Sequence, residues 1–282
     1  MRRFTTSVVT ERPLVGLLLL AELAAAVVLI ASPLGDARHP EQGPPTATHA
    51  SLDVPTTPTD PLTLGDGRTV SLMALGGAHT ADLESRVWGE LDGAADAVTA
   101  FWGDDWQRNV VVVLTRTDEE FRALAAGEPD IAAATTGQRI VFAPGASSMS
   151  DASLRIVLRH ELFHYAARGR TAADAPRWLT EGVADFVGRP PTPMPGSERA
   201  AELAQLPTDA DLETPGAVRS LAYDRAWWFS RFVASRYGAE TLRRLYVTAC
   251  GTGHPDQATA IEDTLGADTP QVLAAWRAWL SG

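Results

Sequence analysis

The residue types that could do chemistry gather in one segment, RHELFHYAARGRTAADAPRWLTEGVADF, residues 159–186. His160 and His164 are four positions apart, so on an α-helix their imidazoles project from the same face. Both side chains can then reach one Zn²⁺ at about 2.0–2.1 Å. Glu161 lies between them, close enough to act as general base on a water molecule that the metal activates. This spacing predicts a zinc site with a base beside it.

A third ligand for the same ion follows downstream. Glu181, within WLTEG, is carried by a second predicted helix and can complete a His₂Glu set. Three protein ligands leave the fourth position of zinc open for water and substrate, as in catalytic zinc sites. One zinc ion per chain is therefore expected. The alternative is a pair of solvated histidines on an amphipathic helix, and the downstream Glu181 argues against it because it meets the needs of the His₂Glu set.

The two motifs resemble those of the gluzincin metallopeptidases, the group that contains thermolysin and the membrane alanyl aminopeptidases. HELFH followed by WLTEGVADF is most similar to short bacterial domains described as peptidase-MA-like. The resemblance covers residues 156–187 and implies an α+β zincin-like fold: a small mixed sheet, then the active-site helix, then a helical C-terminal part. It also implies a peptide or protein substrate, Glu161 as catalytic base, and zinc ligands at His160, His164 and Glu181.

Two more residues receive roles from this resemblance. Asp185 follows Glu181 by four residues and matches the thermolysin-type Glu-x-x-x-Asp arrangement, in which the Asp supports a zinc-bound histidine from behind. A solvated helix carboxylate is the alternative. Tyr223 takes the place of the Tyr or His that donates to the tetrahedral oxyanion in related peptidases, a contact typically worth about 10²–10³ in rate. Packing in the core is the alternative for Tyr223.

A strand near the active-site helix is a candidate for holding the substrate backbone. Residues 131–145 predict a β-hairpin that turns near Thr136 and Gly137, and its second strand directly precedes the zinc helix. Gluzincin-like folds offer the edge of the strand that borders the cleft to an extended peptide. The resemblance places the following residues on that edge: Arg139, Ile140, Val141 and Phe142. An internal strand without substrate contact is the alternative.

Apolar spacing predicts the elements that position these side chains. Residues 68–75 and 109–115 are strand-like, and helical spacing runs from Thr80 to Gly103. Thr117 and Glu120 form a candidate capping box for a short helix.

The active-site helix is expected to begin near Ser150 or Asp151 and to end before Gly169. Pro176 suits the first turn of the next helix. Residues 189–218 are Pro-rich and acidic, and RPPTPMPG at 189–196 predicts an irregular loop near the site. Helices are expected over 222–238 and 239–250, and a last one has Thr269 as its N-cap.

The N-terminal residues predict membrane targeting. Residues 14–32 are apolar and long enough to cross a bilayer as a helix. Arg2, Arg3 and Arg12 precede them, so the positive-inside rule places the N-terminus in the cytoplasm and the remainder outside. Residues 1–35 therefore predict a single-pass anchor in the cell membrane with an extracytoplasmic catalytic domain. Cleavage near the alanines at 24–26 would instead give a secreted protein.

Composition limits the remaining choices. Residues 36–62 are rich in Pro and Thr and predict a disordered linker, which leaves 63–282 as one metallopeptidase domain. A net charge of −11 and a pI near 5.0 give no basic face for nucleic acid. Cys250 is the single cysteine and is expected to be a small buried hydrophobe.

The sequence thus predicts a membrane-tethered, extracytoplasmic zinc peptidase. One alternative is a catalytically inactive zincin-like domain that acts as a cell-envelope binding module, but the intact HELFH and Glu181 argue against it. A second is a structural helical domain in which His160 and His164 are surface residues. The Gly-x-Met-x-Asn sequence of the membrane alanyl aminopeptidases is absent upstream of the helix, which argues against aminopeptidase action.

Overall fold

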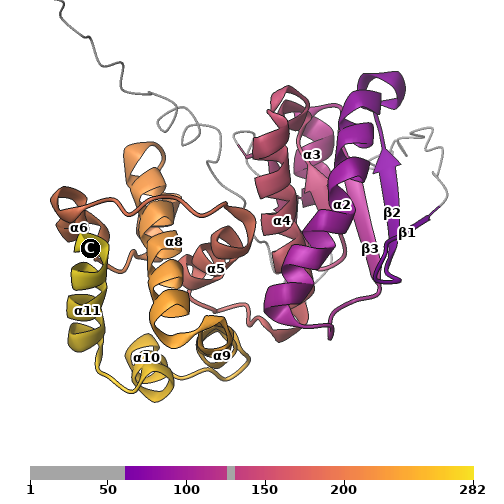
Figure 1. The fold of residues 1–282 in the computed structure, drawn as a ribbon. Helices are drawn as coiled ribbons and strands as arrows, with labels where there is room; N and C mark the ends of the chain where they lie inside the picture. The colour runs from indigo at the N-terminus through magenta and orange to yellow at the C-terminus, as the bar shows by residue number, and fades with distance from the viewer. Residues whose placement is uncertain (1–60, 126–130) are drawn as a thin grey trace, which may run out of the picture.

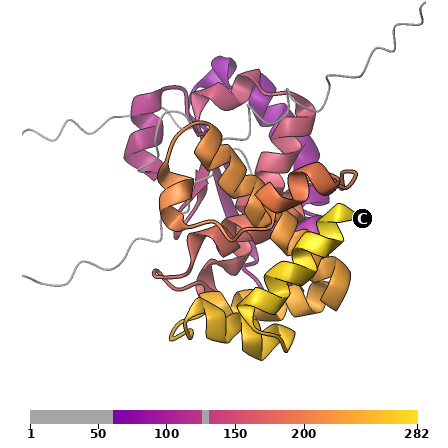
Figure 2. The same ribbon diagram turned by 90° about the vertical axis from the view of Figure 1, so that its left-hand side faces the viewer.

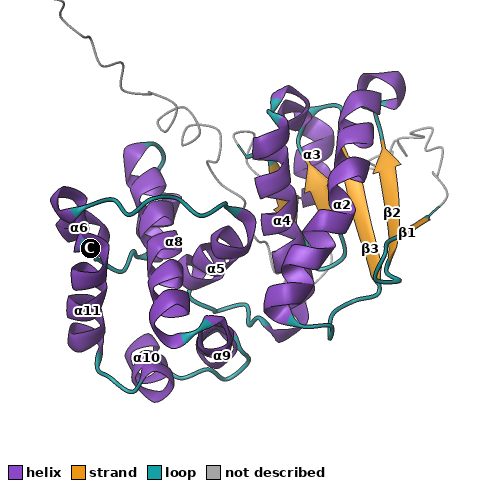
Figure 3. Cartoon of the chain, in the orientation of Figure 1, coloured by secondary structure: helices purple, strands orange, loops and turns teal. Residues whose placement is uncertain are grey.

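The computed structural model describes residues 61–125 and 131–282, and it places a sheet with its helices beside a wholly helical part (Figures 1 and 3). The sheet of the described residues has five strands in the order β1-β2-β3-β5-β4. Strands β2, β3 and β5 run parallel, while β1 and β4 are antiparallel to their neighbours at the two edges. The strands are β1 (Leu62–Thr63), β2 (Thr69–Ala74), β3 (Asn109–Leu114), β4 (Ala133–Thr135) and β5 (Ile140–Phe142). The expected α+β fold with a small mixed sheet is confirmed.

Strand β3 is covered on both faces, as its continuous β-branched run predicts. Side chains alternate along a strand, so Val112 and Leu114 join the core beneath α2 (Ala81–Trp102) and α4 (Asp151–Ala167). Val113 points to the other face, where it packs in a second cluster with Phe121 of α3 (Asp118–Ala125). The sheet is therefore the middle layer between the α2 and α4 pair and α3.

The predicted helix starts are found where side chains cap them. Ser150 caps α4 by accepting a hydrogen bond from the Ser153 N–H at 3.1 Å. Glu120 N–H donates to Thr117 Oγ1 at 3.2 Å, and Thr117 N–H donates to Glu120 Oε2 at 3.2 Å, so the predicted capping box forms. Helix α4 ends at Ala167, before Gly169 as predicted, and a 3₁₀ turn, Arg168–Arg170, follows it.

The C-terminal part consists of helices, which lie on the left in Figure 1 and toward the viewer in Figure 2. The predicted helix at 239–250 is α9, and α10 was not expected. Residues 189–196 form the predicted irregular loop, and two short helices, α6 and α7, follow it. The helices are α5 (Arg177–Gly188), α6 (Ser197–Leu203), α7 (Asp209–Glu213), α8 (Ala217–Tyr237), α9 (Ala239–Cys250), α10 (Gln257–Leu265) and α11 (Thr269–Ser281).

Two helix starts differ from the sequence prediction. Helix α8 begins at Ala217, so Tyr223 lies in its second turn and not at its start. The N-cap of α11 is Asp268, whose carboxylate accepts from the Gln271 N–H at 2.8 Å, and Thr269 is the first helical residue. A carboxylate is a good acceptor for these N–H groups, since the positive end of the helix dipole lies there.

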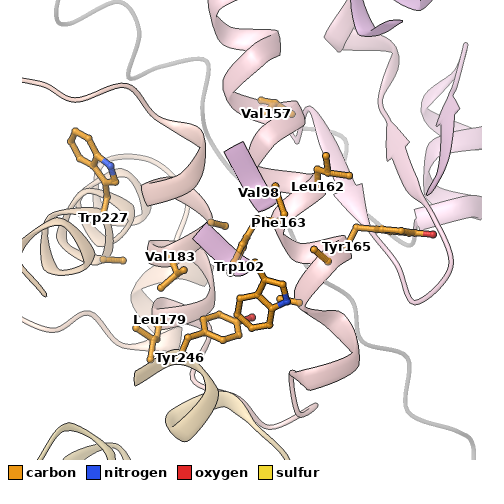
Figure 4. Packing of buried hydrophobic residues seen from close by; sticks show 14 of the residues in the cluster. Val98, Trp102, Val157, Leu162, Phe163, Tyr165, Leu179, Val183, Trp227 and Tyr246 are labelled. Atoms are coloured by element: carbon orange, nitrogen blue, oxygen red, sulfur yellow. The ribbon is translucent and has the colours of Figure 1, made fainter. Parts of the chain in front are cut away.

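Aromatic rings join the two parts of the molecule (Figure 4). Trp102 of α2, Phe163 of α4 and Tyr246 of α9 meet edge to face, with ring centroids 5.4–5.6 Å apart. Such contacts add about 0.5–1.5 kcal/mol each beyond the buried area. The three rings tie α4 to the helical part on the side opposite to the sheet.

Two glycines let α5 lie backbone to backbone against its neighbours. A Cβ atom at Gly182 would be 2.5 Å from the carbonyl oxygen of Ala226 in α8, and one at Gly188 would be 2.9 Å from the carbonyl oxygen of Ile156 in α4. Neither position has room for a side chain. Helix α5 is therefore held close to both α4 and α8.

The predicted anchor at 1–35 and the linker at 36–62, apart from its last residues, lie outside the described residues. Within 61–125 and 131–282, no helix is both long and apolar enough to cross a membrane. The boundary of the metallopeptidase domain at residue 63 stays a prediction.

Candidate metal centre

Three electron-pair donors converge where α4 meets α5. The Nε2 atoms of His160 and His164, one turn apart on α4, are 3.1 Å from each other. Glu181 on α5 directs its Oε2 atom to both, at 3.2 Å from His160 Nε2 and 3.7 Å from His164 Nε2. All three side chains are buried. The structure therefore brings together the three residues that the sequence predicts as ligands.

The geometry of this triad fits a zinc ion. Four ligands at about 2.0–2.1 Å in a tetrahedron are separated from one another by about 3.3 Å. The three separations in the structure, 3.1, 3.2 and 3.7 Å, lie around that value. Two imidazole nitrogens and one carboxylate are also a common donor set of catalytic zinc.

Asp185 lies behind His160, as the Glu-x-x-x-Asp spacing predicts. Its Oδ1 atom is 3.0 Å from His160 Nδ1, and its side chain is buried. When His160 is neutral, Nδ1 donates its proton to Asp185, and the lone pair of Nε2 then faces His164 and Glu181. Asp185 is thus placed to set the tautomer that a metal ligand needs.

The charges of the cluster favour a cation at its centre. Burial works against protonation of His160, but hydrogen bonds to Asp185 and Glu181, together with their charges, raise its pKa to about 10. Burial alone would raise the pKa of Glu181, but the charges of the histidines and their hydrogen bonds lower it to about 2. Positive charge is therefore stabilised where the three ligand atoms meet.

Glu161 is fully buried beside the triad, and within the described residues one of its two carboxylate oxygens has a hydrogen-bond partner. Its Oε2 atom accepts a hydrogen bond from Thr135 Oγ1 at 2.7 Å. Its Oε1 atom has no hydrogen-bond partner within the described part of the chain. Burial raises the pKa of Glu161, although the charges of His160 and His164 act in the opposite direction. The free oxygen is the one available to a reacting group.

Thr135 was missed by the sequence analysis. It is the last residue of β4 and is buried, and its hydroxyl also lies 2.9 Å from the Glu161 backbone oxygen. The available signal was a hydroxyl at the end of the otherwise apolar strand IAAAT, next to the predicted turn.

Tyr223 of α8 reaches the triad from the helical part. Burial raises its pKa well above 10, and the charges of Glu181 and Asp185 and a hydrogen bond to Glu181 act in the same direction. The side chain is buried, so it packs in the core and contacts a candidate ligand at the same time. Its role as oxyanion donor stays a prediction.

The predicted edge position of the strand at 139–142 is wrong, whereas a role of its side chains in substrate binding stays a prediction. Strand β5 lies inside the sheet, where Ile140, Val141 and Phe142 pair with β3 on one side and with β4 on the other. A strand with two partners has no backbone groups left for a peptide, and Arg139 lies in the turn before it. The alternative of an internal strand is the one that the structure shows. Among the described strands, the two at the edges of the sheet are β1 and β4, and the residues of β4 are buried.

A buried arginine that sequence analysis also missed lies behind Asp185. Arg189 Nη2 is 2.6 Å from Asp185 Oδ2, and Arg189 Nη1 donates to Asp224 Oδ1 of α8 at 3.1 Å. The guanidinium carbon is 5.2 Å from the centroid of the Trp227 ring. The available signal was the spacing of Asp185 and Arg189, four residues apart at the end of α5.

A family model described as the eCIS core domain matches residues 96–172, which include His160 and His164 but not Glu181. No curated protein matches the chain significantly.

Solved structures of zinc peptidases are similar to the chain. Legionella pneumophila aminopeptidase A is 15% identical with a TM-score of 0.50, over 79% of this chain and 28% of that one. A mutant M1 zinc metallopeptidase from Deinococcus radiodurans is 19% identical with a TM-score of 0.45, over 80% of this chain and 52% of that one. The chain thus spans about half of the second protein and less of the first. At these identities the likeness is one of fold. The sheet, the HELFH helix and the downstream Glu181 identify the chain as gluzincin-like in fold.

Proposed function

We propose that the chain is a zinc-dependent peptidase that hydrolyses peptide bonds with Glu161 as general base. The observation that carries the proposal is the convergence of His160, His164 and Glu181 beside a carboxylate that has one oxygen without a hydrogen-bond partner among the described residues. The fold shared with Legionella pneumophila aminopeptidase A supports a peptide as substrate.

The side chains divide the work as follows. A Zn²⁺ held by the triad would lower the pKa of a bound water to about 7 and polarise the substrate carbonyl. Glu161 Oε1 accepts the proton of the water whose oxygen adds to the carbonyl carbon, and delivers it to the nitrogen as the C–N bond breaks. Thr135 holds Oε2 meanwhile. Tyr223 is the candidate donor to the oxyanion.

The proposed location follows from the N-terminal residues. Residues 14–32 would anchor the protein as a single membrane span, with the peptidase domain outside the cytoplasm. Deletion of residues 1–35 should move the protein from the membrane fraction to the soluble fraction of expressing cells. Equal amounts in the membrane fraction with and without these residues would contradict the anchor.

The function is tested with the full-length protein and its Glu161→Gln variant. The substitution keeps an oxygen for the Thr135 hydroxyl but removes the base. We expect about one zinc per chain in both proteins, and cleavage of a peptide library by the wild type alone. Cleavage that survives in the variant would contradict the role of Glu161. Full zinc content without cleavage by either protein would favour the inactive binding module.

A further inference from the structure

The Asp185 carboxylate has one oxygen for each of two partners. Oδ1 faces His160 Nδ1 at 3.0 Å, and Oδ2 faces Arg189 Nη2 at 2.6 Å. The backbone N–H of Arg189 also donates to the Asp185 carbonyl at 2.8 Å. Both the main chain and the side chain of Arg189 therefore hold the residue that orients His160.

Arg189 is itself fixed by a second helix. Its other terminal nitrogen donates to Asp224, so the planar guanidinium spans two carboxylates, one on α5 and one on α8. The Arg189 side chain is only 9% exposed. Burying the Asp185 and Asp224 carboxylates near each other without a cation would cost free energy. The planar guanidinium of arginine can bind both carboxylates in a fixed geometry, which the single ammonium group of a lysine cannot.

The end of α5 that carries Arg189 also contacts α4. A Cβ atom at Gly188, the residue before Arg189, would be 3.4 Å from the His160 backbone nitrogen. The end of α5 thus rests on the turn of α4 that carries His160. A displacement of the Arg189 side chain would change the orientation of Asp185. It would not change the distance between α4 and α5, because the backbone contact at Gly188 sets that distance.

We propose that Arg189 is a positioning residue of the metal centre: by bridging Asp185 and Asp224 it directs Asp185 Oδ1 to His160, so that His160 Nε2 faces the metal. The inference rests on the zinc site of the proposed function but not on peptide cleavage. It gives α8 a second contact with the site, through Asp224, in addition to Tyr223.

The test is the zinc affinity of the full-length protein, measured by competition with a chelator at a temperature where each variant is folded. Outer-shell changes typically weaken metal binding about 10–100-fold, and we expect a loss of about tenfold for Arg189→Met. Arg189→Lys keeps the charge but cannot span both carboxylates, so we expect most of that loss to remain. If Arg189→Met does not fold, the zinc affinity of Arg189→Lys still tests the positioning role of Arg189.

The matched control is Arg231→Met. Arg231 lies 4.9 Å from the same Trp227 ring, and it donates to Thr192 instead of a carboxylate of the site. Its removal should leave zinc affinity unchanged. Wild-type affinity in Arg189→Lys, or an equal loss in Arg231→Met, would overturn the inference. A wild type that binds zinc but cleaves no peptide would overturn the proposed catalysis alone, and one that binds no zinc would overturn both.

Discussion

The sheet part and the helical part support the candidate metal centre in different ways. On the sheet side, β4 supplies one neutral hydroxyl, Thr135, which holds the candidate base. On the helical side, α5 and α8 supply an anionic ligand, Glu181, and the charged chain from Asp185 through Arg189 to Asp224. Charged groups act strongly on a cation, whereas a single hydroxyl orients one carboxylate. Beyond the two histidines of α4, the groups from the helical side should therefore govern metal affinity, and Thr135 from the sheet should govern the rate of cleavage.

The largest effect is expected for Glu181→Gln. The substitution removes the only anionic ligand of the triad and leaves the two imidazoles of α4. Zinc affinity should fall by more than the roughly 10–100-fold of an outer-shell change. Chelator competition measures the loss, with Glu213→Gln as control, since Glu213 pairs with Arg177 at the exposed start of α5. Wild-type affinity in Glu181→Gln would show that the helical side does not provide the third ligand.

Thr135→Val tests the sheet side. Valine has nearly the same shape but cannot donate to Glu161, and a hydrogen bond to a charged group contributes about 1.5–3 kcal/mol. That corresponds to about 10- to 150-fold in rate, since about 1.4 kcal/mol is tenfold. We expect kcat to fall while zinc affinity stays the same.

Thr135→Ser restores the hydroxyl and should recover most of the rate. If Thr135→Val instead weakened zinc binding and left kcat unchanged, the division between the two sides would be wrong.

Gly182→Ala tests how closely α5 and α8 must approach. Its Cβ atom would meet the Ala226 carbonyl oxygen at 2.5 Å, and forcing a methyl group into a filled space typically costs about 1–3 kcal/mol. Urea unfolding should show that loss of stability. Gly89→Ala is the matched control: a Cβ atom there meets no heavy atom of residues 61–125 and 131–282 within 4 Å, so the free energy of unfolding should rise by up to about 1 kcal/mol. Equal effects of the two substitutions would contradict the close approach.

The smallest effect concerns Cys250, at the end of α9. The side chain is buried, and burial raises the pKa of its thiol. In the native protein the Cys250 thiol should stay protonated from about pH 7 to about pH 9, a range that includes the usual thiol pKa of about 8.5. An alkylating reagent should therefore modify Cys250 only when the chain is unfolded by denaturant. Rapid modification of the native protein would show that α9 opens locally.

Local sequence patterns determined the elements and the ligand side chains. The spacing of His160 and His164 fixes them to one face of α4 whatever surrounds the helix, because the helical repeat is local. Capping by Ser150 and the box of Thr117 and Glu120 are also decided within a few residues. For the same reason Glu181 and Asp185 share a face of α5 and arrive at the site together.

Only the tertiary structure decided which other groups meet the site. The order of the strands, which places β5 inside the sheet and β4 at its edge, depends on pairing between distant segments and not on the pattern within either strand. Thr135 reaches Glu161 through that order. Arg189 meets Asp224 because the glycines let α5 lie close to its neighbours. The sequence by itself determined which residues could bind the metal, whereas long-range packing decided which residues hold them in place.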